Sequence, residues 1–206
     1  LERTWRELHG TPCLDMEEIV PARKNTCCSR SFGKPLTELV ELEEAVANYA
    51  VRAIRKVRSE GSLACGIQVF VMTNRFREDQ AQYSNARALA LDEPTDDPIR
   101  VIRRAKELLR SIYRPGYSYK KAGVLLSNLV RQDMAPQSLW SHAGSPDALI
   151  AQKKRNQLMQ AFDGINSRFG HGSIAYGTAK RQNNWFMRQE KVSPRYTTRW
   201  EDLPTV

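Results

Sequence analysis

Cys28-Ser29-Arg30-Ser31-Phe32-Gly33 and Tyr119-Lys120-Lys121-Ala122-Gly123-Val124 are the two stretches of sequence that decide the fold. Each is a short run of basic, small and apolar residues that predicts an extended strand. Two helical patterns separate the stretches along the chain. This order predicts that both strands belong to one small α+β sheet.

The segment between the two stretches predicts two helices and two further strands. The four expected strands cover residues 26–32, 63–73, 82–91 and 118–126. The first helix begins with acidic residues and ends with basic ones, as the helix dipole favours, and its apolar stripe is Leu39, Leu42, Val46, Tyr49, Ala50, Ala53, Ile54 and Val57. The second helix starts at Thr95-Asp96-Asp97-Pro98, and its expected stripe is Ile99, Ile102, Ala105, Leu109 and Ile112.

The resulting order, β-α-β-β-α-β, predicts an α+β fold with both helices on one face of a four-stranded sheet. We expect four parts: residues 1–25 as the end of a preceding domain and a linker, 26–130 as the sheet domain, 131–145 as a linker, and 146–206 as a small α+β C-terminal domain. The stripe of the C-terminal helix is Leu158, Phe162, Ile165 and Phe169, and the aromatic and apolar residues expected to close a small core over it are Trp185, Phe186, Met187, Tyr196 and Trp200. Because the chain opens in mid-helix without a methionine, we expect a fragment of a longer protein.

Composition indicates a basic protein. Lysine and arginine number 32 against 23 acidic residues, a formal net charge of +9 that favours polyanionic partners. The four cysteines have no Cys-x-x-Cys spacing, so we expect reduced thiols in the cytosol. No apolar stretch is long enough to span a bilayer.

Residues suited to catalysis do not cluster in the sequence. A two-metal active site needs carboxylates gathered around the ions. The acidic residues here lie at helix starts (38–44 and 96–97) or in turns (78–79 and 92–93), where capping and solvation account for them. The three histidines are far apart in the sequence. We therefore expect no catalytic residue and no metal site in this chain.

Basic and hydroxyl residues on the two deciding strands predict contacts with a nucleic acid backbone. Ser29, Arg30 and Ser31 lie on the first strand, and Lys120 and Lys121 lie on the last. Extended strands present N–H groups and short hydroxyls to phosphates, while arginine and lysine supply charge. Adjacent strand residues alternate faces, so only one of the two lysines faces the ligand unless the strand is bulged. Weaker candidates for the same surface are Arg75, Arg77 and Arg87. The alternative is solvated charge on edge strands.

These motifs resemble a known family. Residues 29–33 and 119–124, with the β-α-β-β-α-β order between them, are similar to the first and last strands of the little-finger DNA-binding domain of Y-family translesion DNA polymerases. Ser193-Pro194-Arg195-Tyr196-Thr197-Thr198-Arg199 resembles the C-terminal signature of the UmuC-type SOS mutagenesis proteins, catalytic subunits of the DNA polymerase V kind. Residues 1–13 resemble the end of their thumb, so the likeness covers essentially the whole chain, without palm and fingers.

The resemblance implies a non-catalytic, DNA-binding part of an error-prone translesion polymerase of SOS mutagenesis and DNA repair. It implies backbone contacts to template–primer DNA through Ser29, Arg30, Ser31, Lys120 and Lys121. It also implies that magnesium serves the catalytic domain and no cofactor serves this part, and that the location is the bacterial cytoplasm at the nucleoid.

The resemblance implies protein partners as well. In this family a short segment with a first glutamine, a leucine and a last aromatic docks the sliding clamp. The matching stretch is Pro136-Gln137-Ser138-Leu139-Trp140, with Gln137, Leu139 and Trp140 as candidates, although Pro136 stands where the motif has glutamine. The alternative is that Leu139 and Trp140 anchor the linker on its own domain. The UmuD-type accessory subunit and the recombinase filament are the partners implied for the C-terminal domain.

Two rival functions remain. RNA-binding RRM domains share the β-α-β-β-α-β order, but they stack bases on aromatics of the first and third strands, and Tyr83-Ser84-Asn85-Ala86-Arg87 offers no such pair. The second rival is a protein-interaction adaptor that acts through its C-terminal domain. Binding of partner proteins without binding of DNA at low salt would favour the adaptor.

Overall fold

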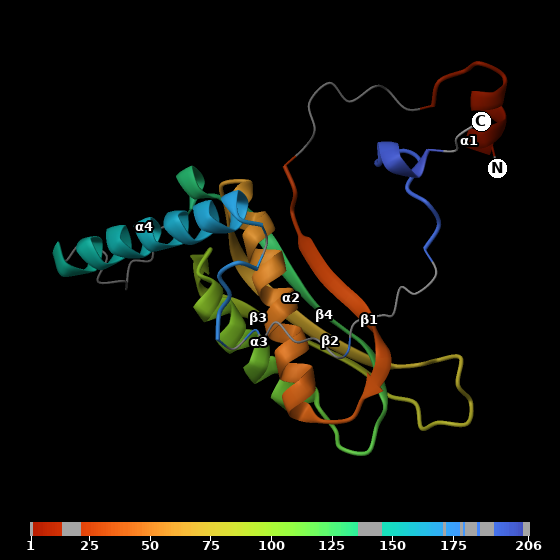
Figure 1. The fold of residues 1–206 in the computed structure, drawn as a ribbon, viewed down its shortest axis with the longest axis horizontal. Coiled ribbons are helices and arrows are strands. Elements are labelled where there is room, and N and C mark those ends of the chain that lie inside the picture. Colours follow the sequence, from red (N-terminus) through yellow and green to blue (C-terminus); the bar gives the residue numbers. More distant parts are fainter. Residues whose placement is uncertain are drawn as a thin grey trace.

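The computed structural model describes residues 2–13, 22–135, 146–170, 172–177, 179, 185 and 192–203 (Figure 1). In chain order its elements are α1 (Glu2–Leu8), β1 (Thr26–Leu36), α2 (Leu39–Ser59), β2 (Ser62–Thr73), β3 (Ser84–Thr95), α3 (Pro98–Ile112), β4 (Tyr119–Arg131), the 3-10 turn η1 (Gln132–Met134), α4 (Pro146–Arg168) and the 3-10 turn η2 (Trp200–Asp202). No helix of the described residues is long and apolar enough to cross a membrane.

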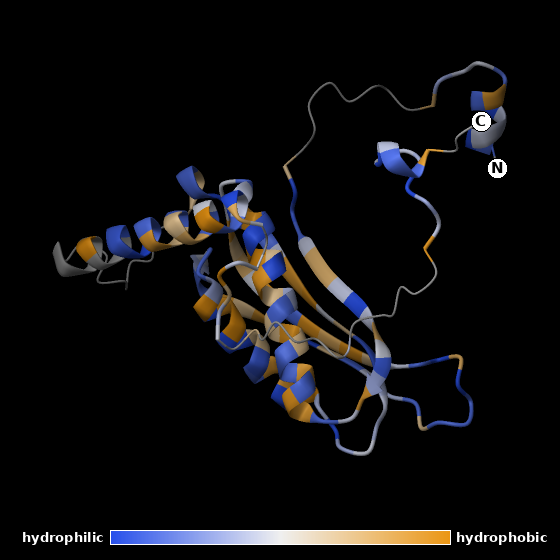
Figure 2. Ribbon diagram, in the orientation of Figure 1, coloured by the Kyte–Doolittle hydropathy of each residue, from blue (hydrophilic) through white to orange (hydrophobic). Residues whose placement is uncertain are grey.

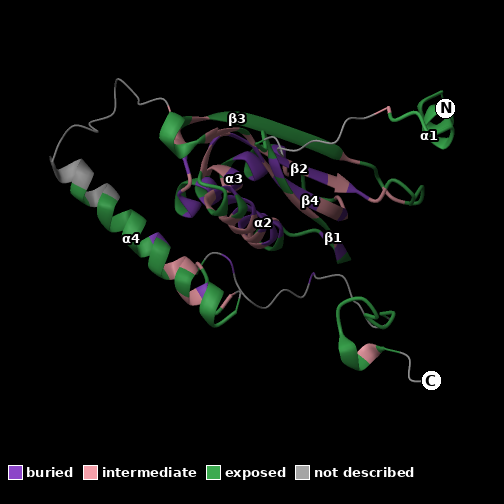
Figure 3. Ribbon diagram, turned by 90° about the horizontal axis from the view of Figure 1, so that it is seen from above, coloured by how far each residue is buried: buried purple, intermediate pink, exposed green. Residues whose placement is uncertain are grey.

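The sheet has four strands in the order β1-β4-β2-β3, and every neighbouring pair is antiparallel. Helices α2 and α3 pack on one face of it (Figure 3). The predicted α+β class and the order of elements are therefore confirmed. Three strands end later than expected: β1 continues past a bulge to Leu36, β3 continues to Thr95, and β4 continues to Arg131 because it stays paired with β2 as far as Ser62.

The core lies between the sheet and the two helices. Every residue of the expected α2 stripe is buried except Leu39, which is partly buried and packs against the same core. Helix α3 begins as expected, because Asp97 caps it by accepting a hydrogen bond from the Ile99 amide at 2.8 Å and Pro98 is its first residue. Ile99 itself was predicted to be buried, and this is wrong, because its exposed fraction is 53%.

The reason for the Ile99 error is helical geometry. The buried residues of α3 are Pro98, Val101, Ile102, Ala105, Leu108, Leu109 and Ile112. At 3.6 residues per turn, Ile99 lies about 120° around the helix from the centre of the stripe formed by the residues from 101 onward.

The C-terminal region departs most from expectation. Leu158 and Phe169 were predicted to face a core, but their exposed fractions are 60% and 67%. Tyr196 and Trp200 are also exposed, whereas Trp185 is buried against Phe32 of β1 and Tyr49 of α2. Trp185 thus joins the core of the sheet domain, so the expected aromatic core over α4 is wrong for these residues.

Other expectations for this region are not tested. Phe186 and Met187 lie outside the described residues, and the boundaries expected at residues 25, 130 and 145 stay predictions. Within the described part of residues 146–206, the assigned elements are α4 and η2.

Candidate nucleic-acid interface

The sheet face opposite α2 and α3, which we call the open face, is the candidate interface. Residues paired directly across antiparallel strands point to the same side. The buried Val69 and Val124 form one such pair on the helix side, so their neighbours along β2 and β4 point to the open face. By this alternation the open face includes Ser29 and Ser31 of β1, Lys121 and Gly123 of β4, Gly66 and Phe70 of β2, and Ala86, Ala88 and Ala90 of β3.

Three of the predicted contact residues lie together on this face. Ser29 is opposite Gly123, and Ser31 is opposite Lys121, on the adjacent strands β1 and β4. The three side chains are half-buried, so each keeps part of its surface in solvent. Two hydroxyls beside one ammonium form a small donor cluster that suits phosphate oxygens.

Lys120 lies at a bulge. On one side of it, Lys121 pairs with Ser31 of β1 and with Met72 of β2. On the other side, Tyr119 pairs with Leu36 and Thr73, so the register with both neighbouring strands shifts around Lys120. The Lys120 ammonium donates a hydrogen bond to the Phe32 carbonyl at 2.5 Å. The bulge therefore breaks the alternation of the two lysines, and Lys120 secures the bulged part of β1.

Two glycines keep the open face flat. A Cβ on Gly123 would stand 2.3 Å from Phe70 Cζ and 2.5 Å from Ser29 Cβ. A Cβ on Gly66 would stand 2.5 Å from the Ser127 hydroxyl. The Phe70 ring therefore lies across β4, and the small Ala86, Ala88 and Ala90 continue the low surface over β3. A flat surface lets a phosphate backbone approach the strands closely. The sequence motif contains Gly123 but does not predict this role, because Phe70 comes from a different strand.

Arg75 and Arg77 lie in the β2–β3 loop at the Lys121 end of the sheet, since Met72 and Thr73 pair with Lys121 and Tyr119. The loop is predominantly hydrophilic (Figure 2). Both guanidinium groups are exposed, and Arg77 Nη1 lies 3.5 Å from Asp79 Oδ2. Glu78 and Asp79 of the same loop balance the two arginines, so the loop adds guanidinium groups beside the open face but no net charge.

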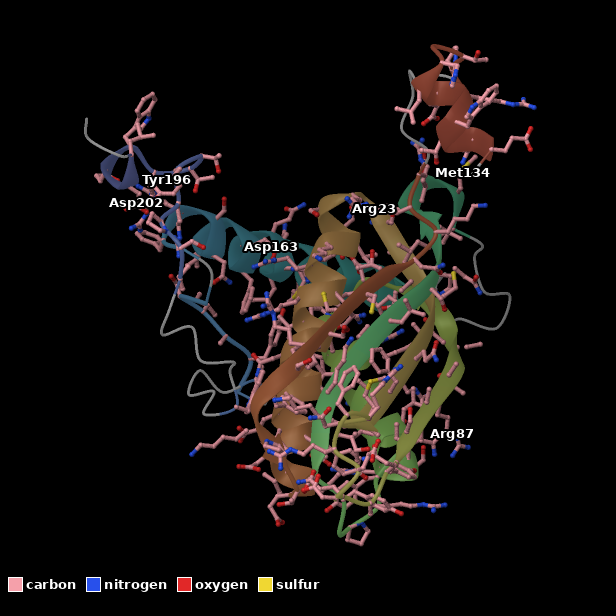
Figure 4. All side chains as sticks on the ribbon, turned by 90° about the vertical axis from the view of Figure 1, so that its right-hand side faces the viewer. Arg23, Arg87, Met134, Asp163, Tyr196 and Asp202 are labelled. Carbon is pink, nitrogen blue, oxygen red and sulfur yellow. The ribbon has the colours of Figure 1, made fainter. Side chains whose placement is uncertain are left out.

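Arg30 and Arg87 point the other way. Arg30 is opposite the buried Ala122, and Arg87 is opposite the buried Val69, so both belong to the helix side of the sheet. Figure 4 shows Arg87 on the outer strand β3. The structure therefore does not bring Arg30 and Arg87 together with Lys121, although sequence analysis grouped them.

Three further candidates, Gln137, Leu139 and Trp140, lie outside the described residues. Among the described residues, no group of three or more histidine, cysteine, aspartate or glutamate side chains is placed to hold a metal ion. The acidic side chains have other roles: Glu43 pairs with Lys106 and Arg110, and Asp97 caps α3. The described carboxylates therefore do not form the ligand set that the two metal ions of phosphoryl transfer need.

Comparison with known proteins assigns the class. The impB/mucB/samB family C-terminal domain matches residues 23–139, more than half of the chain, and a domain of unknown function (DUF4113) matches residues 156–206. The chain therefore belongs to the impB/mucB/samB family. The resemblance to UmuC-type Y-family polymerases, inferred from the motifs, is confirmed.

Individual relatives extend this match. The chain is 39% identical over 203 residues to Protein UmuC of Salmonella typhimurium, covering 98% of this chain and 47% of that protein. It is 35% identical over 204 residues to Protein MucB of Escherichia coli, covering 99% and 46%, and 30% identical over 152 residues to DNA polymerase IV of Desulfatibacillum aliphaticivorans, covering 71% and 36%. The chain spans less than half the length of these relatives.

Solved structures with a partial likeness come from DNA polymerases. An insertion ternary complex of Dbh DNA polymerase matches with a TM-score of 0.40 and 14% identity, covering 52% of this chain and 29% of that one. A complex of the beta-clamp processivity factor with the little finger domain of PolIV matches with a TM-score of 0.40 and 15% identity, covering 57% and 99%.

Proposed function

We propose that this chain holds template–primer DNA through the open face of its sheet, by contacts to the phosphate backbone. The observation that carries the proposal is the cluster of Ser29, Ser31 and Lys121 on a flat face opposite α2 and α3. Such donors contact phosphates and read no base, so binding is independent of sequence. Arg75 and Arg77 add guanidinium groups at one end of the face, where Glu78 and Asp79 of the same loop balance their charge.

Family membership supports a role for this binding in an error-prone translesion polymerase of SOS mutagenesis and DNA repair. In this role the chain binds the DNA. Magnesium and nucleotide transfer belong to the part of the relatives' length that this chain does not match. The protein then acts in the bacterial cytoplasm at the nucleoid.

Protein partners form a second level of the proposal. Gln137, Leu139 and Trp140 are the proposed contacts to a sliding clamp, and the region from residue 146 is the proposed contact to a UmuD-type accessory subunit and a recombinase filament. The motif at residues 136–140 and the family match support this assignment.

The RNA-binding rival fits the sheet poorly. An RRM domain stacks RNA bases on aromatic side chains of its first and third strands. Here β1 and β3 are the opposite edge strands of the sheet. The open-face residues of β3 are Ser84, Ala86, Ala88 and Ala90, which offer no aromatic ring. The adaptor reading remains the alternative, and the exposed Leu158 and Phe169 of α4 are the observation that favours it.

The slope of binding against salt tests the DNA-binding proposal. Each phosphate contact contributes about 0.9 to the slope of log affinity against log salt for duplex DNA. Lys121→Ala should therefore lower the slope by about 0.9 in a fluorescence titration of labelled primer–template DNA. Lys120→Ala should lower it less, because the Lys120 ammonium already donates to the Phe32 carbonyl.

The matched control is Arg103→Ala, which removes one exposed cation from α3 on the other side of the sheet. Equal slopes for the Lys121 and Arg103 variants would show that the open face does not bind the backbone.

A further inference from the structure

A basic cavity lies at the edge of the sheet formed by β1 and extends over the helix side of this strand. Its volume is about 670 Å³, and its walls come from β1, α2, α4, Pro98 at the start of α3, and residues 172, 174–176 and 179. The cationic side chains that line it are Arg30, Arg52, Arg55, Lys56 and Arg58, and the one carboxylate among its described lining residues is Asp163. Asp163 is already paired with Arg58, through a hydrogen bond of 2.6 Å from Nη2 to Oδ2.

The cations line this cavity together with Cys28. Burial raises the pKa of the Cys28 thiol, and the positive charges of Lys56, Arg52 and Arg30, which line the same cavity, oppose that rise. Arg52 and Arg30 act in the same way on the buried Tyr49 hydroxyl. Arg55 and Lys56 have no carboxylate partner within the described part of the chain. The cavity thus carries a surplus of positive charge.

The C-terminal region completes the cavity. Phe162 of α4 and Tyr176 both line it, and their rings stack with centroids 4.7 Å apart. The Gly33 amide of β1 donates to the Trp185 carbonyl at 2.9 Å, which ties the C-terminal region to the edge of the sheet. Asp163 and Arg58 make the second tie, between α4 and α2.

We propose that this cavity binds a phosphate and adjoining nucleotide of single-stranded nucleic acid. The volume is within the range of sites that enclose one small molecule, and a duplex is too wide to enter it. Cations along a groove together with aromatic rings are the features that bind single strands without sequence preference. Ser29 belongs to the open face and also lines the cavity beside Arg30, so a strand that leaves a duplex on the open face reaches the cavity around this edge of β1.

The inference rests on the proposed function for its choice of DNA as the ligand. We would titrate the 206-residue chain against labelled oligothymidylate of about 12 nucleotides, and against primer–template duplex, at several salt concentrations. The cavity variant is Arg55→Ala with Lys56→Ala. The matched control is Arg103→Ala with Lys153→Ala, which removes the same charge from exposed helix positions outside the cavity.

The cavity variant should lower the salt slope for oligothymidylate by about 1.4, since each single-strand phosphate contributes about 0.7. Its duplex slope should match that of the control. Arg30→Ala, at an exposed position of β1, should lower the oligothymidylate slope by about 0.7 and serves as a second variant if the α2 changes disturb folding.

Two results would overturn the inference. One is an oligothymidylate slope that changes no more in the cavity variant than in the control. The other would come from a parallel titration with poly-glutamate. If the cavity variant loses poly-glutamate binding but keeps oligothymidylate binding, the cavity binds an acidic protein segment. Failure of the proposed function looks different: duplex binding would then not respond to Lys121→Ala, whatever the cavity variant does.

Discussion

Gly123 lies on β4 in the middle of the open face, beneath the ring of Phe70. Its lack of a side chain lets two neighbours, Phe70 and Ser29, occupy the same level of the face. The motif from Tyr119 to Val124 predicts the strand. It does not predict that the ring of Phe70, from a strand far away in sequence, covers this glycine.

Gly123→Ala should destabilise the fold by about 1–3 kcal/mol, because the added methyl group overpacks the space between Phe70 and Ser29. Gly164→Ala is the control: a Cβ there meets nothing within 4 Å, and alanine favours the α4 helix by up to about 1 kcal/mol. Urea unfolding followed by circular dichroism measures both changes. A Gly123 variant as stable as the wild type would show that the face is not tightly packed.

The side of the sheet to which each residue points decides which of the predicted site residues lie together. Ser29, Arg30 and Ser31 are consecutive, so alternation separates Arg30 from the two serines. That separation follows from the sequence once the strand is accepted. The side of the sheet that the helices cover does not follow from the sequence, because it depends on packing over the whole sheet. For this reason the prediction grouped Arg30 and Arg87 with Lys121.

At the scale of elements, periodicity predicts the helices and strands well, and their irregularities poorly. The bulge around Lys120 depends on pairing with both β1 and β2. From the sequence, only the consequence of a bulge can be predicted, which is that both lysines could then face the ligand. The basic residues of α2 were assigned to the helix dipole, yet the spacing of Arg52, Arg55 and Lys56 also puts them along one side of the helix, where they line the cavity.

The C-terminal region is the element whose packing was least predictable, because Trp185 contacts residues far away in sequence. Trp185 is buried beside Phe32 and Tyr49, with ring centroids 5.8 and 5.6 Å away. Trp185→Ala should therefore lower the free energy of unfolding by about 3–5 kcal/mol.

Trp200→Ala is the matched control for Trp185→Ala, since Trp200 is 85% exposed and its loss should change stability by less than about 0.5 kcal/mol. Thermal unfolding of the two variants compares them directly. Equal stability of the two variants would contradict the insertion of Trp185 into the core of the sheet domain.

For the whole molecule, the sheet separates two surfaces of different character. The open face is flat and offers hydroxyls, one lysine and the arginines of the β2–β3 loop. The helix side carries the basic cavity at the edge where α4 and Trp185 join the sheet. The net charge of +9 predicts a polyanionic partner but does not say which surface meets it.

Photo-crosslinking from two neighbouring positions of β3 tests most directly whether DNA lies on the open face. Ala88 points to the open face and Arg87 to the helix side, and both are exposed. With benzoylphenylalanine at one position or the other, primer–template DNA should crosslink strongly to the Ala88 variant and weakly to the Arg87 variant. Equal or stronger crosslinking from position 87 would contradict the placement of DNA on the open face.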